Sequence, residues 1–200
     1  MQKKIIGASR APAAQAVGEA YHEHVFFNPQ GLGRQANPAI YASYAPPQTV
    51  SPEGGERSTG VQAQRGVECV TLLLQGQLEV RDSAGHAHQL NRGDVLWGGA
   101  GRGLLREQRL GHDLGRDGGT LELLTLWVNL PAQYKPTDPH CQHLPAAGLP
   151  QVTLPEGAGT VAVMGTGIDR IYPARHRELA HRIAAHGAAG TMSHQAKILI

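Results

Sequence analysis

The sequence has few cysteines, few aromatic residues and no cluster of like charges. Two cysteines in 200 residues are too few for a disulfide framework. Aromatic residues make up 4% of the chain, so aliphatic side chains must build most of the core. The formal net charge is +2 and the basic residues are scattered, which argues against the basic face that direct nucleic-acid binding requires.

Long hydrophobic runs are also missing. Lys3 and Lys4 precede only a short apolar stretch, shorter than the core of a secretory signal. No segment is long and apolar enough to span a bilayer. We therefore expect no membrane partner and, because cysteines are so few, a cytoplasmic location.

Glycine and proline, by contrast, are abundant, with 26 and 13 residues. Short apolar runs at residues 67–74, 78–80 and 95–97 alternate with turns rich in Gly, Asn and Asp. Residues 120–128 add another strong strand pattern. Short strands separated by such turns are typical of an antiparallel β-barrel or sandwich, so the sequence predicts an all-β fold.

Three segments resemble a known family. The chain contains RGVECVTLLLQGQLEVRDSAG (residues 65–85), GDVLWGGAGRG (93–103) and LWVNLPAQYKPT (126–137), in an order and spacing that resemble the pirin family of the cupin superfamily. The resemblance implies a cupin-like antiparallel β-barrel that holds one iron through three histidines and a glutamate, followed by a second barrel. Some pirins act as quercetin 2,3-dioxygenases, and others are described as nuclear transcription co-regulators.

The positions that correspond to the family's iron ligands are all substituted in this chain. The resemblance places a His-x-His pair just before Arg65, where the sequence has Gln62 and Gln64. It places a His-x-Glu pair just after the Gly-Arg-Gly turn and two apolar residues, where the sequence has Arg106 and Gln108. Glutamine offers only a neutral carbonyl oxygen and arginine offers no lone pair, whereas Fe²⁺ prefers imidazole and carboxylate. We therefore predict no iron cofactor.

A buried arginine at this position needs a countercharge. Glu68 follows Gln64 by four residues on the entering strand, and we expect it to pair with Arg106 in the former metal cavity. The three glutamines would then form an amide network around the guanidinium group. Such a pocket suits a small polar or anionic ligand near Arg106.

The resemblance also divides the chain into three segments: an N-terminal arm (residues 1–20), the pirin-like barrel (21–147) and an incomplete second-barrel region with a short helical tail (148–200). In the last segment we predict two short strands near residues 152–154 and 160–163, and a helix within 174–190. An incomplete barrel leaves strand edges exposed, so this region is a candidate for self-association or a protein partner. Whether residues 168–200 are a folded short form or a remnant of truncation stays open.

Three histidine motifs lie outside the substituted positions. They are HEH at residues 22–24, HAH at 86–88 and HCQH at 140–143. HEH could place two imidazoles on one face of a strand and HAH lies in an expected turn, and for both of them solvated histidines are the favoured interpretation. HCQH is similar to part of a zinc site but lacks a second pair at ligand spacing. The last motif lies in a proline-rich segment that we expect to be a linker.

These residues predict a pirin-like cupin protein that has lost its iron ligands and acts as a non-catalytic binding or regulatory protein. The alternative is an iron-dependent quercetin 2,3-dioxygenase-type oxidoreductase, which would need metal in the cavity. A relic without function is the third interpretation.

Overall fold

The computed structural model describes residues 12–31, 36–52, 56–149, 151–153 and 160–162. The chain divides into two compact units, residues 1–145 and 146–200, and each is described by itself. Nearly all regular structure in the first unit is antiparallel β-strand, which confirms the all-β prediction.

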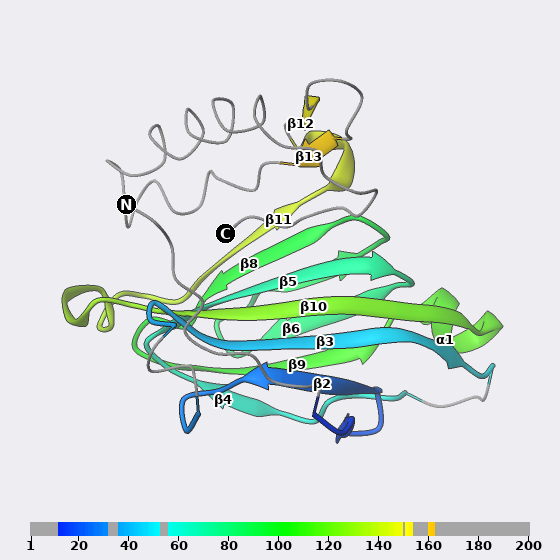
Figure 1. The fold of residues 1–200 in the computed structure, drawn as a ribbon, viewed down its shortest axis with the longest axis horizontal. Coiled ribbons are helices and arrows are strands. Elements are labelled where there is room, and N and C mark those ends of the chain that lie inside the picture. Colours follow the sequence, from blue (N-terminus) through cyan, green and yellow to red (C-terminus); the bar gives the residue numbers. More distant parts are fainter. Residues whose placement is uncertain (1–11, 32–35, 53–55, 150, 154–159, 163–200) are drawn as a thin grey trace. The chain divides into compact units, whose positions relative to one another are not determined.

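The larger sheet of the first unit has seven strands, with β10 running through its middle between β3 and β5 (Figure 1). Its strands, in spatial order, are β1 (Gln15–Val17), β2 (Tyr21–Phe27), β3 (Ala39–Val50), β10 (Gly119–Asn129), β5 (Val67–Gln75), β8 (Val95–Gly99) and β11 (His140–Leu144). Strands β5, β8 and β10 follow the apolar runs of the sequence closely. The N-terminal arm and the proline-rich linker each contain a strand, because β1 pairs with β2 and β11 pairs with β8.

The smaller sheet has four strands: β4 (Gln62–Gln64), β9 (Leu104–Leu110), β6 (Leu78–Asp82) and β7 (Ala87–Leu90), in spatial order. The two sheets share one core. Leu73, Leu96 and Leu123 of the larger sheet pack in the same buried cluster as Leu78 and Leu90 of the smaller one. Aliphatic residues dominate this core, as the low aromatic content requires.

Helical structure is sparse in the described residues. The short helix α1 (His112–Asp117) connects β9 to β10 and buries Leu114 in the core, in a stretch whose polar composition is typical of a loop. Single 3-10 turns occur at η2 (Ala132–Tyr134) and η3 (Ala146–Gly148). No helix in these ranges is long and apolar enough to cross a membrane.

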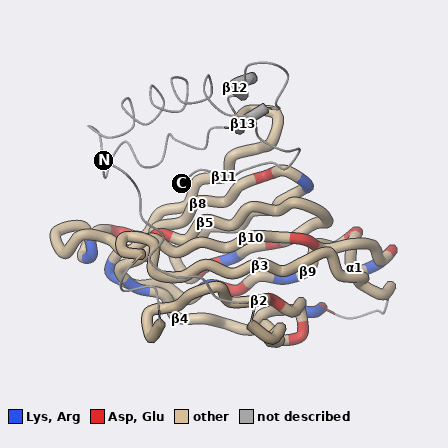
Figure 2. The backbone as a smooth tube through the Cα atoms, viewed as in Figure 1, with Lys and Arg blue, Asp and Glu red and all other residues tan. Residues whose placement is uncertain are grey.

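In the second unit, β12 (Gln151–Thr153) and β13 (Thr160–Ala162) pair with each other, as the two apolar runs predicted. The expected helix within residues 174–190 lies outside the described residues. Among the described residues of the chain, basic side chains are interspersed with acidic ones and no strand is uniformly basic (Figure 2).

Candidate functional site

The substituted ligand positions come together on neighbouring strands. Gln62 pairs with Arg106 across β4 and β9, and Gln64 pairs with Leu104. Residues two apart on a strand share a face, so Gln62 and Gln64 lie on one face of β4, and Arg106 and Gln108 lie on one face of β9. Gln64 and Arg106 are buried, Gln108 is half-buried and Gln62 is exposed. The intervening Leu105 points the other way and is half exposed.

A cavity of ≈ 390 Å³ opens between the two sheets at these positions. The described residues that line it come from both sheets: Gln15, Ala16, Val17, Gly18, Tyr21, Glu23, Tyr41, Gln62, Gln64, Cys69, Gln108, Thr125 and Trp127. Three of the four substituted positions are among them, whereas Arg106 is not. The guanidinium group therefore lies outside the lining of this cavity.

Glu23 is the functional side chain that the sequence analysis overlooked. It lies on β2 between His22 and His24, and strand alternation turns it inward while His22 is exposed to solvent. Its side chain accepts a hydrogen bond from Tyr41 Oη (2.5 Å) and one from Ser43 Oγ (2.7 Å). The HEH motif thus supplies a fixed, buried carboxylate to the cavity rather than a pair of imidazoles.

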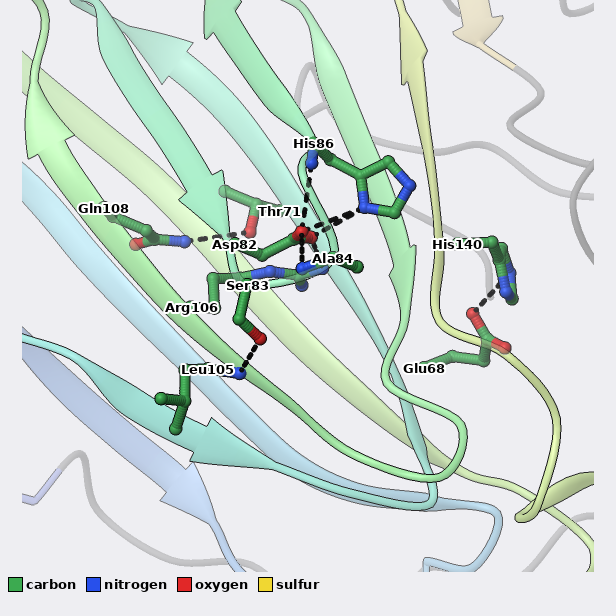
Figure 3. Close-up of polar contacts among 10 residues, drawn as sticks. All are labelled: Glu68, Thr71, Asp82, Ser83, Ala84, His86, Leu105, Arg106, Gln108 and His140. Atoms are coloured by element: carbon green, nitrogen blue, oxygen red, sulfur yellow. Dashed lines mark hydrogen bonds and ion pairs between the residues drawn. The ribbon is translucent and has the colours of Figure 1, made fainter.

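Gln108 is oriented by two hydrogen bonds. Tyr21 donates from its hydroxyl to Gln108 Oε1 at 2.9 Å. Figure 3 shows the second bond, in which Gln108 Nε2 donates to Thr71 Oγ1 at 3.5 Å. Burial, followed by the charge of Glu23, raises the pKa of Tyr21 well above its ordinary value. Tyr21 therefore stays a neutral donor, and the amide of Gln108 is held in one orientation.

The expected Arg106–Glu68 pair is wrong. The Arg106 side chain is 3% exposed, and its Nη2 lies 3.6 Å from Oδ2 of Asp82, its partner across β9 and β6. The guanidinium group packs against Gly98, where a Cβ atom would collide with it. Asp82 is thus the countercharge that the buried arginine needs.

Glu68 faces away from Arg106 because of strand parity. Glu68 pairs with Gly99 across β5 and β8, whereas Cys69 pairs with Gly98, the residue that Arg106 contacts. Adjacent residues of a strand point to opposite faces, so Glu68 lies on the far side of the sheet from the guanidinium group. Figure 3 shows it beside His140, away from Arg106.

On that far face Glu68 has its own partners. Its Oε2 accepts a hydrogen bond from Trp97 Nε1 at 2.8 Å and lies 3.4 Å from His140 Nε2. Glu68 is 2% exposed, and these contacts compensate its buried carboxylate at Oε2, whereas Oε1 has no hydrogen-bond partner among the described residues. The contacts join β5 to β8 and to β11, and Glu68 does not line the cavity.

Asp82 also anchors the hairpin between β6 and β7. Its Oδ1 accepts hydrogen bonds from the backbone N–H groups of Ala84 (3.0 Å) and His86 (3.1 Å), and His86 Nδ1 lies 3.0 Å away. Burial favours a raised pKa for Asp82, but the hydrogen bonds and charge of His86 outweigh it and hold the pKa below its ordinary value. Asp82 is therefore a carboxylate shared between the hairpin and Arg106.

The second histidine of the HAH motif meets the HCQH motif at the edges of the two sheets. The His88 and His143 rings have centroids 5.9 Å apart, and His143 Nε2 lies 3.0 Å from Asp94 Oδ2. These histidines are partly buried rather than fully solvated. No group of three His, Cys, Asp or Glu side chains in the described part of the chain has a geometry that could hold a metal ion.

The environment of His88, next to His143, makes the free energy of unfolding depend on pH. Burial, followed by the charges of His143 and His86, lowers the pKa of His88 below 6.5. The unfolded chain therefore binds more protons than the folded chain as the pH falls from 6.5 to that lowered pKa, and stability decreases over this window. We expect H88Q to show a smaller loss of unfolding free energy than the parent between pH 7.5 and 5.5, measured by urea unfolding.

The exposed His112 provides the control for this experiment. H112Q should lose the same stability as the parent over the same pH range. An unchanged pH dependence in H88Q would contradict the assignment.

Two buried polar atoms of the cavity lining have no hydrogen-bond partner among the described residues. They are Gln64 Oε1, which is an acceptor, and Trp127 Nε1, which is a donor. A buried polar group without a partner costs about 1–3 kcal/mol. A bound molecule that supplies those partners is therefore favoured.

The cavity does not fit the iron that the family resemblance implies. Glu23 is the only carboxylate in the described lining, and burial raises the pKa of the Cys69 thiol more than its polar neighbours lower it. The other candidate donors in the lining are neutral amides and hydroxyls, which are poor ligands for Fe²⁺. The donor set instead suits hydrogen bonding to an organic molecule.

Comparison with family models gives two matches. Residues 20–128 match the model described as Pirin, which covers more than half of the chain and all of the substituted positions. Residues 149–197 match the model described as DNA recombination-mediator protein A. That second match falls on the segment expected to be an incomplete second barrel, whose described part is limited to β12, β13 and residues up to 149.

Individual relatives agree with the first match. A Pseudomonas aeruginosa protein provisionally named a quercetin 2,3-dioxygenase is 35% identical over 162 residues, which span 81% of this chain and 57% of that protein. Human Pirin is 36% identical over 101 residues, which span 50% of this chain and 32% of its own length.

A solved structure supports the fold as well. The crystal structure of a quercetin 2,3-dioxygenase from Acinetobacter baumannii superposes with a TM-score of 0.77 at 32% identity, covering 82% of this chain and 57% of that one. The chain thus spans little more than half the length of the Pseudomonas aeruginosa and Acinetobacter baumannii proteins. The likeness confirms the cupin-like fold.

Proposed function

Because the chain belongs to the pirin family, we propose that it is a non-catalytic member that binds a small polar molecule in the barrel and carries no iron. One observation carries the proposal. The family's four ligand positions are occupied by Gln62, Gln64, Arg106 and Gln108, yet a cavity remains beside three of them. The scaffold has kept a binding space and lost the donors for metal.

The size and lining of the cavity support a small-molecule site. Its volume of ≈ 390 Å³ lies in the range of small-ligand pockets, which is about 300–1,000 Å³. Such pockets combine apolar and aromatic walls with a few fixed polar groups. Tyr41 and Trp127 provide the walls here, and Glu23, Gln64 and Gln108 provide the polar groups.

The alternative function is an iron-dependent quercetin 2,3-dioxygenase. It is favoured by the names of the Pseudomonas aeruginosa and Acinetobacter baumannii relatives. Against it stands the donor set, because the described lining offers one carboxylate and no imidazole, whereas Fe²⁺ prefers both kinds of donor. We therefore keep the binding function as the proposal.

Oxygen consumption distinguishes the two functions. We expect the purified chain with quercetin and added Fe²⁺ to consume oxygen no faster than the same mixture without protein. The Acinetobacter baumannii enzyme serves as the positive control. Uptake clearly above the protein-free rate would overturn the proposal in favour of the dioxygenase.

Location and partners are proposals of the same kind. Cys69 and Cys141 are both free thiols, which is the usual state in a reducing compartment, and we propose the cytoplasm. We also propose self-association or a protein partner through the C-terminal region. Residues 163–200 of that region lie outside the described residues.

A further inference from the structure

We propose that the cavity selects a small organic cation, with Glu23 as its countercharge. The inference rests on the proposed function, since it names the class of molecule that the same cavity binds. It replaces the anionic ligand that Arg106 suggested in the sequence. Three features of the cavity favour a cation: the negative charge of its lining, acceptor atoms that are free to bind a ligand, and aromatic walls.

The charge of the lining is negative. Among the described residues that line the cavity, Glu23 is the only one with a charged side chain. Arg106 lies outside this lining, and the carboxylate of Asp82, 3.6 Å from its Nη2, offsets its charge. Both partners are almost fully buried, so solvent screens them little and they compensate each other. A ligand in the cavity therefore meets one uncompensated anion.

Glu23 has acceptor capacity left for a ligand. An ionised carboxylate offers about four lone-pair sites. Tyr41 occupies one site on Oε1 and Ser43 one on Oε2, which fixes the group and leaves a free site on each oxygen. Burial, followed by the hydrogen bond to Glu23, raises the pKa of Tyr41, so this tyrosine remains a neutral donor. The carboxylate is thus held ready for a further donor.

Gln64 provides a second acceptor aimed at the same space. Its side chain lines the cavity, the residue is 7% exposed, and its Oε1 has no hydrogen-bond partner among the described residues. An ammonium group carries three donors and no acceptor, which complements a carboxylate and a free carbonyl oxygen. An anionic group would instead place acceptor against acceptor at both positions, although Trp127 Nε1 in the same lining is an unpartnered donor.

Aromatic rings complete the cavity. Tyr21, Tyr41 and Trp127 all line it, and the rings of Tyr41 and Trp127 have centroids 4.9 Å apart. The face of an aromatic ring attracts a cation, by about 0.5–2 kcal/mol depending on desolvation. A carboxylate next to aromatic walls recognises an organic ammonium ion better than a hydrated inorganic cation, because the apolar part of the organic ion packs against the rings.

Three ligands of matched shape test the charge preference. Phenethylamine, 2-phenylethanol and phenylacetate differ mainly in a terminal group that is positive, neutral or negative at pH 7. We expect isothermal titration of the full chain to show phenethylamine binding at least about tenfold more tightly than 2-phenylethanol, because hydrogen bonds to charged groups contribute about 1.5–3 kcal/mol. Phenylacetate should bind least.

Two variants test the residues. In E23Q, phenethylamine should lose about tenfold in affinity while 2-phenylethanol changes less than about threefold. E122Q is the matched control, because Glu122 also accepts a tyrosine hydroxyl (Tyr44, 2.5 Å) and an amide (Gln75, 2.7 Å) but does not line the cavity. Phenethylamine affinity should be the same in E122Q as in the parent.

The possible failures are distinguishable. Tighter binding of 2-phenylethanol or phenylacetate than of phenethylamine overturns the charge preference and leaves the binding function standing. Binding of none of the three overturns both. If E23Q does not fold, the Q64E variant provides the test. Its second carboxylate should increase the affinity for phenethylamine. An unchanged affinity would contradict the proposal of a cationic ligand.

Discussion

Replacing Asp82 with alanine should lower the free energy of unfolding by about 3–5 kcal/mol, because it leaves the Arg106 guanidinium group buried and without a countercharge. The substitution also removes the acceptor for the backbone N–H groups of Ala84 and His86. Urea unfolding at pH 7 measures the effect directly. Few single substitutions in this barrel should cost as much.

Two further variants make the Asp82 prediction specific. D113A removes the carboxylate of a solvent-exposed ion pair with Arg116 and should cost less than about 1 kcal/mol. Adding R106M to D82A removes the orphaned charge and should recover part of the lost stability. A loss in D82A no larger than that in D113A would show that Asp82 is not the countercharge.

Restoring the family's ligand pattern should restore iron binding. The combined variant Q62H/Q64H/R106H/Q108E places three imidazoles and one carboxylate on positions that share the inner face of β4 and β9. We expect it to hold about one equivalent of Fe²⁺ per chain, because imidazole and carboxylate are the donors that non-haem iron prefers. Equilibrium dialysis under anaerobic conditions measures the stoichiometry.

Arg106 provides the internal control for this experiment. The triple variant Q62H/Q64H/Q108E keeps the guanidinium group and its fixed charge, and its iron affinity should be at least about tenfold lower. The full variant should also gain thermal stability when iron is added, since a ligand that binds only the folded state stabilises it. A full variant that binds no iron would show that more than these four side chains was lost.

The sequence predicts the strands well and the faces of the strands less well. The apolar runs at residues 67–74 and 120–128 fall within β5 and β10. β5 is buried on both faces over much of its length, and such strands read as continuous apolar segments, whereas β10 alternates between buried and half-buried residues. Glu68 was assigned to the cavity by its spacing from Gln64. Gly66 lies between these two residues, and its φ of 66° interrupts the extended chain between β4 and β5. Residues on the two sides of this break therefore do not have to point to the same face of the sheet.

Other misses have local causes. Glu23 could have been found from alternation alone, since Tyr21 and Glu23 share the face opposite to His22 and His24. Asp82 ends β6 at the start of a hairpin turn, and a hairpin signal in the sequence does not show which of its side chains will be buried. Strand β11, with the sequence HCQHL, has no apolar alternation, and its pairing with β8 depends on tertiary contacts.

The central claim is that this barrel has exchanged its metal site for a cavity that binds an organic molecule. Elemental analysis of the full chain, purified without chelators from cells grown with added iron, tests it most directly. We expect the purified chain to contain far less than one equivalent of iron or of any other transition metal. A stoichiometric transition metal that survives gel filtration would contradict it.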